Sequence, residues 1–230
     1  MDRPYVHINV AATADGKIDT FERRGAAISS QRDKERVDFL RAAADAVMVG
    51  GHTLHDEDPR LTVKSETLRA ERLKHGLPAN PAKVGVSSRL HLNPGSVFLN
   101  AGPTQILLFT TSRTDESQLE MLRSCGAEVF VHEGESVNLN AMLETLKNMG
   151  VNRLMVEGGA TLNFELMRLG VVDELTIYVA PMIFGGESAP GTAAGSGLVR
   201  SAAIPLKLAE SQVWDDGGIL LRYHFEKRLK

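Results

Sequence analysis

Short apolar runs alternate with longer amphipathic segments between residues 83 and 169, and this alternation limits the possible folds most strongly. We expect strands at 83–86, 105–109, 128–131 and 153–156, and helices at 115–123, 139–149 and 159–169. Strands that alternate with helices of this length form βαβ units, whose strands are parallel because each helix crosses back over the sheet. The pattern therefore predicts an α/β fold with a mostly parallel central sheet flanked by helices.

The first third of the chain supplies further elements of this kind. Residues 5–10 alternate around β-branched side chains and predict a first strand. A helix should follow, because Ser30 and Asp33 have the spacing of a capping box. Residues 46–49 form a continuous apolar run, which is typical of a strand covered on both faces. Residues 66–76 are charged and weakly amphipathic, and they predict a surface helix or an insertion.

The last third changes pattern and favours antiparallel strands. We expect strands at 175–179, 207–213 and 219–225, with no helix of comparable strength between them. A turn at 215–218 joins the last two strands as a C-terminal hairpin. Residues 185–203 are rich in Gly, Ala and Ser and predict a long loop over a site. No shift in composition marks a boundary, so we expect one domain over residues 1–230.

Charge and cysteine content exclude several classes of protein. Lys and Arg number 26 against 29 Asp and Glu, a formal net charge of −3. Proteins that bind nucleic acid or anionic membranes carry a basic excess, so we expect neither partner. No apolar run approaches the roughly 18–20 residues of a membrane helix. Cys125 is the single cysteine, which excludes an intrachain disulfide and a cysteine-built zinc site. We expect a soluble, cytoplasmic protein without a metal.

Two places share the order strand, Gly-Gly, any residue, Thr. They are Val49-Gly50-Gly51-His52-Thr53 and Val156-Glu157-Gly158-Gly159-Ala160-Thr161. The carboxyl ends of parallel strands form a ligand crevice, and N–H groups at a helix start attract phosphate. A plain strand-to-helix turn explains either place alone equally well, and neither matches the common nucleotide fingerprints. The second place is the stronger candidate because a clear helix follows it and Glu157 stands at the strand end.

Several motifs, taken together, resemble one family. They are Asn9, Thr13–Lys17, Leu40-Arg41-Ala42, Met48-Val49-Gly50, Thr53, 58–63 (Asp-Pro-Arg-Leu-Thr-Val), 157–163 (Glu-Gly-Gly-Ala-Thr-Leu-Asn), 172–175, 178–181 and 184–186. In this order they resemble the pyrimidine reductases of riboflavin biosynthesis, relatives of dihydrofolate reductase in fold. The similarity runs from about residue 5 to residue 225. The length resembles that of the archaeal-type 2,5-diamino-6-ribosylamino-4(3H)-pyrimidinone 5′-phosphate reductases, which lack the deaminase domain of the bacterial enzymes.

The resemblance implies a dihydrofolate-reductase-like fold and a homodimer that transfers a hydride from NADPH to the substrate's ribosylamino chain, giving a ribitylamino chain. By motif position it assigns cofactor binding to Thr53, Glu57, Ser88, His91, Leu92, Gly158, Gly159, Ala160 and Thr161. It assigns substrate binding to Asp33, Arg41, Arg60, Leu61, Lys64 and Glu157. Glu157 is also the candidate catalytic residue, as a polar partner near the pyrimidine. Relatives often carry an arginine where this chain has His91, in a loop that we expect near the adenosine end of the cofactor.

Two alternatives stay open at this point. A reductase of the same fold could act on the deaminated pyrimidine or on a pterin or folate-like substrate. The chain could also be a non-catalytic module that binds NADPH. Measuring turnover with each class of substrate distinguishes these hypotheses.

Overall fold

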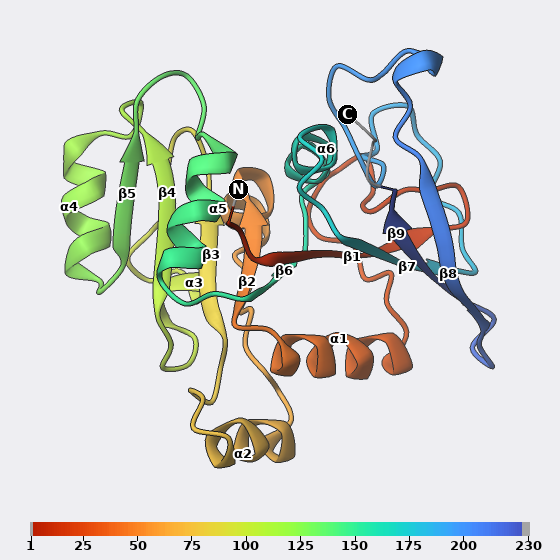
Figure 1. Ribbon diagram of the computed structural model, residues 1–230, viewed down its shortest axis with the longest axis horizontal. Helices are drawn as coiled ribbons and strands as arrows, with labels where there is room; N and C mark the ends of the chain where they lie inside the picture. The colour runs from red at the N-terminus through yellow and green to blue at the C-terminus, as the bar shows by residue number, and fades with distance from the viewer. Residues whose placement is uncertain (1, 227–230) are drawn as a thin grey trace. The chain divides into compact units, whose positions relative to one another are not determined.

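The computed structural model describes residues 2–226 and forms two compact units. Unit 1 comprises residues 2–4 and 35–155, and unit 2 comprises residues 5–34 and 156–226. Figure 1 shows the elements of both units in chain order. Each unit is described by itself below, and a single domain over the whole chain stays a prediction.

Unit 1 is built on a sheet whose strands run parallel. Its strands are β2 (Ala46–Gly50), β3 (Ala82–Val86), β4 (Ile106–Thr111), β5 (Glu128–His132) and β6 (Arg153–Val156), in the order β5-β4-β3-β2-β6. In the parallel pairs, Met48 lies beside Val84, and Val84 lies beside Leu107. All three side chains are fully buried, as expected for a sheet that is covered on both faces.

The helical elements of unit 1 differ in length. They are α1 (Gln31–Ala43, which begins in unit 2), the π-helical turn η1 (Thr53–Glu57), α2 (Glu66–Lys74), α3 (Val97–Asn100), α4 (Glu116–Ser124) and α5 (Leu139–Asn148). Helix α4 lies alongside β5 in Figure 1 and contacts it. Val49, Leu54, Phe98 and Leu108 belong to one buried cluster, so η1 and α3 pack into the same core as the sheet.

Unit 2 combines one parallel pair of strands with an antiparallel hairpin. Its elements are β1 (Tyr5–Thr13), α6 (Ala160–Arg168), β7 (Glu174–Ala180), η2 (Arg200–Ala202), β8 (Leu206–Val213) and β9 (Ile219–Phe225). The strand order is β1-β7-β9-β8, where β1 and β7 are parallel and the other pairs are antiparallel. At the hairpin turn, Trp214 N–H donates to Gly218 C=O at 2.9 Å. The Trp214 and Tyr178 rings pack with centroids 5.2 Å apart.

The predicted fold class is confirmed, including the antiparallel C-terminal hairpin. Local signals also located helix starts correctly: the Asp33 N–H donates to Ser30 Oγ at 3.2 Å, as the capping-box spacing predicts. Of the charged segment 66–76, residues 66–74 form the helix α2, and Ser65 caps it by accepting from Leu68 N–H. Residues 185–203 lack a strand and contain only the short turn η2. None of the helices in the described part of the chain has the length and apolarity of a membrane span.

Candidate active site

The segment that follows β2 and η1 contains two residues with left-handed backbone. Asp58 has a φ of 44° and Leu61 a φ of 49°. Non-glycine residues rarely adopt this conformation, which costs on the order of 1–3 kcal/mol and persists only where the surroundings enforce it. Strain of this kind gathers at functional sites. This observation therefore marks the segment 58–64 as a functional candidate independently of its sequence motif.

Side chains from α1 and α2 hold this segment in place. Arg41 Nη1 donates to Thr62 C=O at 3.1 Å. The buried carboxylate of Asp38 accepts the backbone N–H of Lys64 at 2.6 Å and that of the following residue at 2.8 Å. Arg69 Nη1 donates to Lys64 C=O at 2.6 Å. Two predicted substrate residues, Arg41 and Lys64, thus belong to one hydrogen-bonded cluster, and the side chain of Lys64 is exposed.

The other predicted substrate residues differ in their surroundings. The Leu61 side chain is 1% exposed and lies in the core of unit 1, which leaves only its backbone to meet a ligand. Arg60 is exposed. The buried carboxylate of Asp33 accepts a hydrogen bond from Ser29 Oγ at the start of α1. Glu157 is half-buried and directly follows β6.

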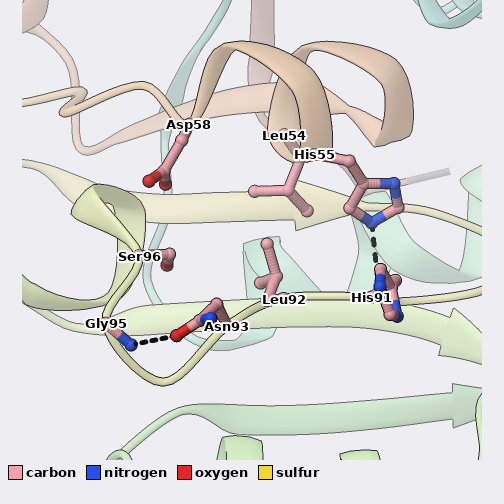
Figure 2. Close-up of a pocket in the computed structure, with 8 residues that line it drawn as sticks. All are labelled: Leu54, His55, Asp58, His91, Leu92, Asn93, Gly95 and Ser96. Carbon is pink, nitrogen blue, oxygen red and sulfur yellow. Dashed lines mark hydrogen bonds between the residues drawn. The ribbon is translucent and has the colours of Figure 1, made fainter.

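A cavity of about 500 Å³ opens within unit 1, at the carboxyl ends of β2 and β3 (Figure 2). It is lined by Leu54, His55, Asp58, His91, Leu92, Asn93, Gly95 and Ser96. The structure thus brings the predicted cofactor residues His91 and Leu92 to one cavity. Neighbouring strand ends supply its walls, which is where ligands bind in parallel α/β sheets. The remaining lining residues were not predicted from the sequence, because they belong to the short elements η1 and α3 and to the loop before α3.

One wall of the cavity carries a neutral histidine. The His91 backbone N–H donates to His55 Nε2 at 3.3 Å, as Figure 2 shows, so that nitrogen is unprotonated. Burial lowers the pKa of His55 below its ordinary value of 6.5, and Asp56 opposes this effect. The neighbouring imidazoles of His91 and His52 lower the pKa of His55 further. Near pH 7 this wall therefore presents a neutral imidazole.

The opposite wall is fixed through the short helix α3. The Asp58 carboxylate accepts the backbone N–H of Phe98 at 2.8 Å and that of the preceding residue at 2.6 Å. At the other end of α3, the fully buried Lys83 Nζ donates to the carbonyls of Phe98 at 2.7 Å and Ala101 at 2.5 Å. Burial, with a smaller effect of Arg60, lowers the pKa of Lys83 to about 8. Asp58 and Lys83 thus hold the helix that borders the cavity.

The predicted cofactor residues Thr53, Glu57 and Ser88 also lie at these strand ends. Thr53 is buried and begins η1, whereas Glu57 is exposed and ends it. The Ser88 carbonyl accepts from Thr111 Oγ1 at 2.7 Å, which ties the loop after β3 to the end of β4. A Cβ on Gly51 would lie 2.7 Å from Ser87 Oγ. Any larger residue at position 51 would therefore force the Ser87 side chain to shift where the chain leaving β2 approaches this loop.

The second Gly-Gly turn lies in unit 2 and leads directly into α6. Gly158 has a φ of +110°, and a Cβ built on it would meet nothing within 4 Å. Gly159 is the N-cap of α6 with extended backbone, and Ala160 is the first helical residue. The first N–H groups of a helix have no partner within the helix and attract anions. The open space and the helix start together fit a phosphate group of a nucleotide cofactor.

The predicted site residues thus divide between the two units. Unit 1 contains Arg41, Thr53, Glu57, Arg60, Leu61, Lys64, Ser88, His91 and Leu92, and unit 2 contains Asp33, Glu157, Gly158, Gly159, Ala160 and Thr161. Within unit 1 the structure brings Arg41 and Lys64 into one cluster, and His91 and Leu92 into one cavity. Within unit 2 it places Glu157 next to the turn that starts α6.

The fold defines the class of protein first: this is an α/β chain with the fold of a pyrimidine reductase. A solved pyrimidine reductase-like protein from Corynebacterium diphtheriae matches it with a TM-score of 0.83 at 22% identity, over 98% of this chain and 93% of that chain. The RibD C-terminal domain family model matches residues 4–220. The chain belongs to the RibD C-terminal domain family.

Two archaeal proteins are similar to this chain over most of their length. One, from Archaeoglobus fulgidus, is 42% identical in an aligned region that spans 88% of this chain and 91% of the relative. The other, from Methanothermobacter thermautotrophicus, is 39% identical in an aligned region that spans 91% of this chain and 93% of the relative. Both are named 2,5-diamino-6-ribosylamino-4(3H)-pyrimidinone 5′-phosphate reductase. The family that the motifs of the sequence resemble is therefore confirmed.

Proposed function

We propose that this chain is a reductase of riboflavin biosynthesis that converts the ribosylamino group of 2,5-diamino-6-ribosylamino-4(3H)-pyrimidinone 5′-phosphate to a ribitylamino group. The observation that carries the proposal is the sequence identity of 42% and 39% between this chain and the two archaeal reductases of that name, over 88% and 91% of this chain. The strained and tightly held segment 58–64 supports it, because that segment carries the motif on which the resemblance rests.

A nicotinamide cofactor, which we propose to be NADPH, supplies the hydride when bound. We assign one of its phosphates to the start of α6, at Gly158–Thr161, where a Cβ on Gly158 would point into open space. We assign its adenosine end to Ser88, His91 and Leu92, because His91 and Leu92 line the cavity of unit 1. Thr53 and Glu57 complete the set that we propose for the cofactor.

The substrate phosphate requires cationic partners, and the cluster around residues 62–65 offers them. Arg41 carries five N–H donors in a planar fork that suits phosphate oxygens. One of these nitrogens, Nη1, donates to Thr62 C=O, which fixes the direction of the guanidinium group. Lys64 adds a compact charge on an exposed side chain, with its backbone N–H fixed by Asp38. We propose Arg41 and Lys64 for the phosphate, with Arg60, Asp33 and the Leu61 backbone as further substrate contacts.

The reduction adds a hydride to C1′ of the C=N bond of the opened ribosylamino group, whose nitrogen carries a proton. A C–H bond forms at C1′, an N–H bond remains at the adjacent nitrogen, and the C=N double bond becomes single. The chain must orient C1′, exclude water and keep a proton at that nitrogen. We propose Glu157 for the last task, because its carboxylate stands at the end of β6 beside the α6 turn.

The test is turnover by the purified protein with NADPH and three substrates: the diaminopyrimidine phosphate, its deaminated analogue and dihydrofolate. We expect NADPH oxidation with the diaminopyrimidine phosphate and formation of the ribitylamino product. Turnover of only the deaminated compound or only dihydrofolate would overturn the substrate assignment. Tight NADPH binding without any turnover would favour a non-catalytic module. A homodimer and a cytoplasmic location stay predictions.

A further inference from the structure

Asn163 is a buried polar residue of α6 that the proposed reaction does not use. Its side chain is fully buried. Its Nδ2 donates to the Thr192 carbonyl at 3.0 Å, but its Oδ1 has no hydrogen-bond partner among residues 2–226. A buried acceptor without a donor destabilises the fold, and most buried polar groups are paired. A leucine at this position would remove that unpaired atom, so packing alone does not explain the asparagine.

The partner of Asn163 belongs to the long loop 185–203, which the first turn of α6 holds at two further points. Ala194 N–H donates to Ala160 C=O at 3.0 Å. Gly195 packs on the Phe164 ring so closely that a Cβ there would lie 2.5 Å from Phe164 Cδ1. Residues 192–195 are therefore fastened to residues 160–164 by two hydrogen bonds and one steric contact.

The start of the same loop is fastened to the turn after β1. Lys17 Nζ donates to Ala189 C=O at 3.0 Å, and Ile18 N–H donates to Pro190 C=O at 2.9 Å. Asp15 accepts the backbone N–H of Gly185 at 2.8 Å. Because residues 185–190 are held there independently of α6, the Asn163 contact acts on residues 192–195 and not on the start of the loop.

We propose that Asn163 is a positioning residue that couples the loop segment 192–195 to cofactor binding at the start of α6. This inference rests on the proposed function, because it takes the α6 turn as the phosphate site. Ala160 makes the link, since its N–H belongs to the first turn that meets the phosphate and its carbonyl accepts from Ala194. Coupling is reciprocal: a phosphate that orders this turn orders the loop, and loss of the loop contact weakens cofactor binding.

Asn163→Leu tests the coupling, because leucine fills the same buried space without either polar atom. We expect NADPH to slow amide hydrogen exchange in residues 192–197 of the wild-type protein, and Asn163→Leu to abolish that slowing. We expect the Kd for NADPH to rise about five-fold, at the lower end of typical couplings, while the thermal midpoint stays equal or rises. Affinity lost together with thermal stability would contradict a positioning role, as would a variant with wild-type exchange and affinity.

Asn138→Leu is the matched control. Asn138 lies in unit 1, outside the α6 region, and its Oδ1 caps α5 by accepting from Ala141 N–H. We expect this variant to lose thermal stability but to keep the Kd for NADPH and the exchange of residues 192–197. An equal loss of NADPH affinity in Asn138→Leu would contradict the proposal, because it would show that any weakened helix start has the same effect.

Gly195→Val tests the same coupling by changing the loop and leaving α6 unchanged. It also provides a test of the proposal if Asn163→Leu fails to fold. Its side chain collides with the Phe164 ring and pushes the loop from α6 without altering α6 itself. We expect faster exchange in residues 192–197 and weaker NADPH binding. Unchanged NADPH affinity despite a displaced loop would overturn the coupling. If the wild-type protein fails to bind NADPH at all, the proposed function fails instead.

Discussion

Lys83 is a lysine that the fold buries completely beside the carbonyls of α3. Its pKa is about 8 in the folded protein against 10.5 for an ordinary lysine. The unfolded chain therefore binds more protons between these pH values, so this residue makes the unfolding free energy rise as pH rises from 8 to 10.5. Between pH 8 and pH 10, we expect the unfolding free energy of the wild-type protein to rise on the order of 1–3 kcal/mol more than that of Lys83→Met. Chemical denaturation at the two pH values measures this difference.

Lys74 provides the control for this prediction, since its side chain is 74% exposed. We expect Lys74→Met to keep the wild-type dependence of unfolding free energy on pH. The account of Lys83 is wrong if Lys83→Met shows the same rise between pH 8 and pH 10 as the wild-type protein.

Arg41 should act on the substrate and not on the cofactor. We expect Arg41→Ala to raise the substrate KM roughly 10- to 100-fold, because hydrogen bonds to charged groups contribute about 1.5–3 kcal/mol, while the Kd for NADPH stays unchanged. Steady-state kinetics and a binding titration measure the two quantities. Arg69→Ala is the matched control, because Arg69 also donates to the backbone of this segment. If the substrate KM rose equally in both variants, Arg41 would only hold the segment in place, and the proposed contact with the substrate would be wrong.

Residues with a local signal could be predicted from the sequence, and those set by tertiary contacts could not. The Ser30–Asp33 cap depends on residues three apart and was predicted correctly. The left-handed backbone at Leu61 has no such signal, because leucine rarely adopts it, and the greater tolerance of aspartate for it does not single out Asp58 from the other aspartates. Burial of Lys83 likewise depends on α3, which lies 14 residues further along the chain.

Among the elements, α6 carries the sharpest prediction about the cofactor. Gly159 has φ −75° and ψ 179°, a conformation open to any residue. We expect Gly159→Val to fold and to raise the Kd for NADPH about ten-fold, because a branched side chain would stand where a phosphate meets the helix start. Fluorescence titration with NADPH measures the change, and circular dichroism checks the fold. Gly191→Val is the control, as a Cβ there makes an ordinary contact of 3.5 Å. Wild-type affinity in Gly159→Val would refute the phosphate assignment.

Elements of ordinary length could be predicted, whereas the shortest could not. The strands and α1, α2, α4, α5 and α6 follow from periodicity and caps. The turn η1 and the four-residue helix α3 were missed, because each is too short to show a period. Both border the cavity of unit 1, so the missed elements explain why six of its lining residues were not among the predicted site residues.

For the whole molecule, the alternation of strands and helices was sufficient to predict the parallel sheet, because it extends over most of the chain. The division into two compact units was not predicted, since it depends on which segments pack together and leaves no trace in composition. Family membership followed from motifs spread along the chain and is confirmed by the match over residues 4–220. The roles of individual site residues stay predictions.

Transfer of deuterium from NADPH labelled at C4 of its nicotinamide tests the central claim most directly. The purified protein is incubated with each of the two C4-labelled forms and the diaminopyrimidine phosphate, and the product is analysed by mass spectrometry and NMR. The account predicts that one labelled form places a single deuterium at C1′ of a ribitylamino product, and that the other places none. A product without deuterium at C1′ from either form, or no product at all, would contradict it.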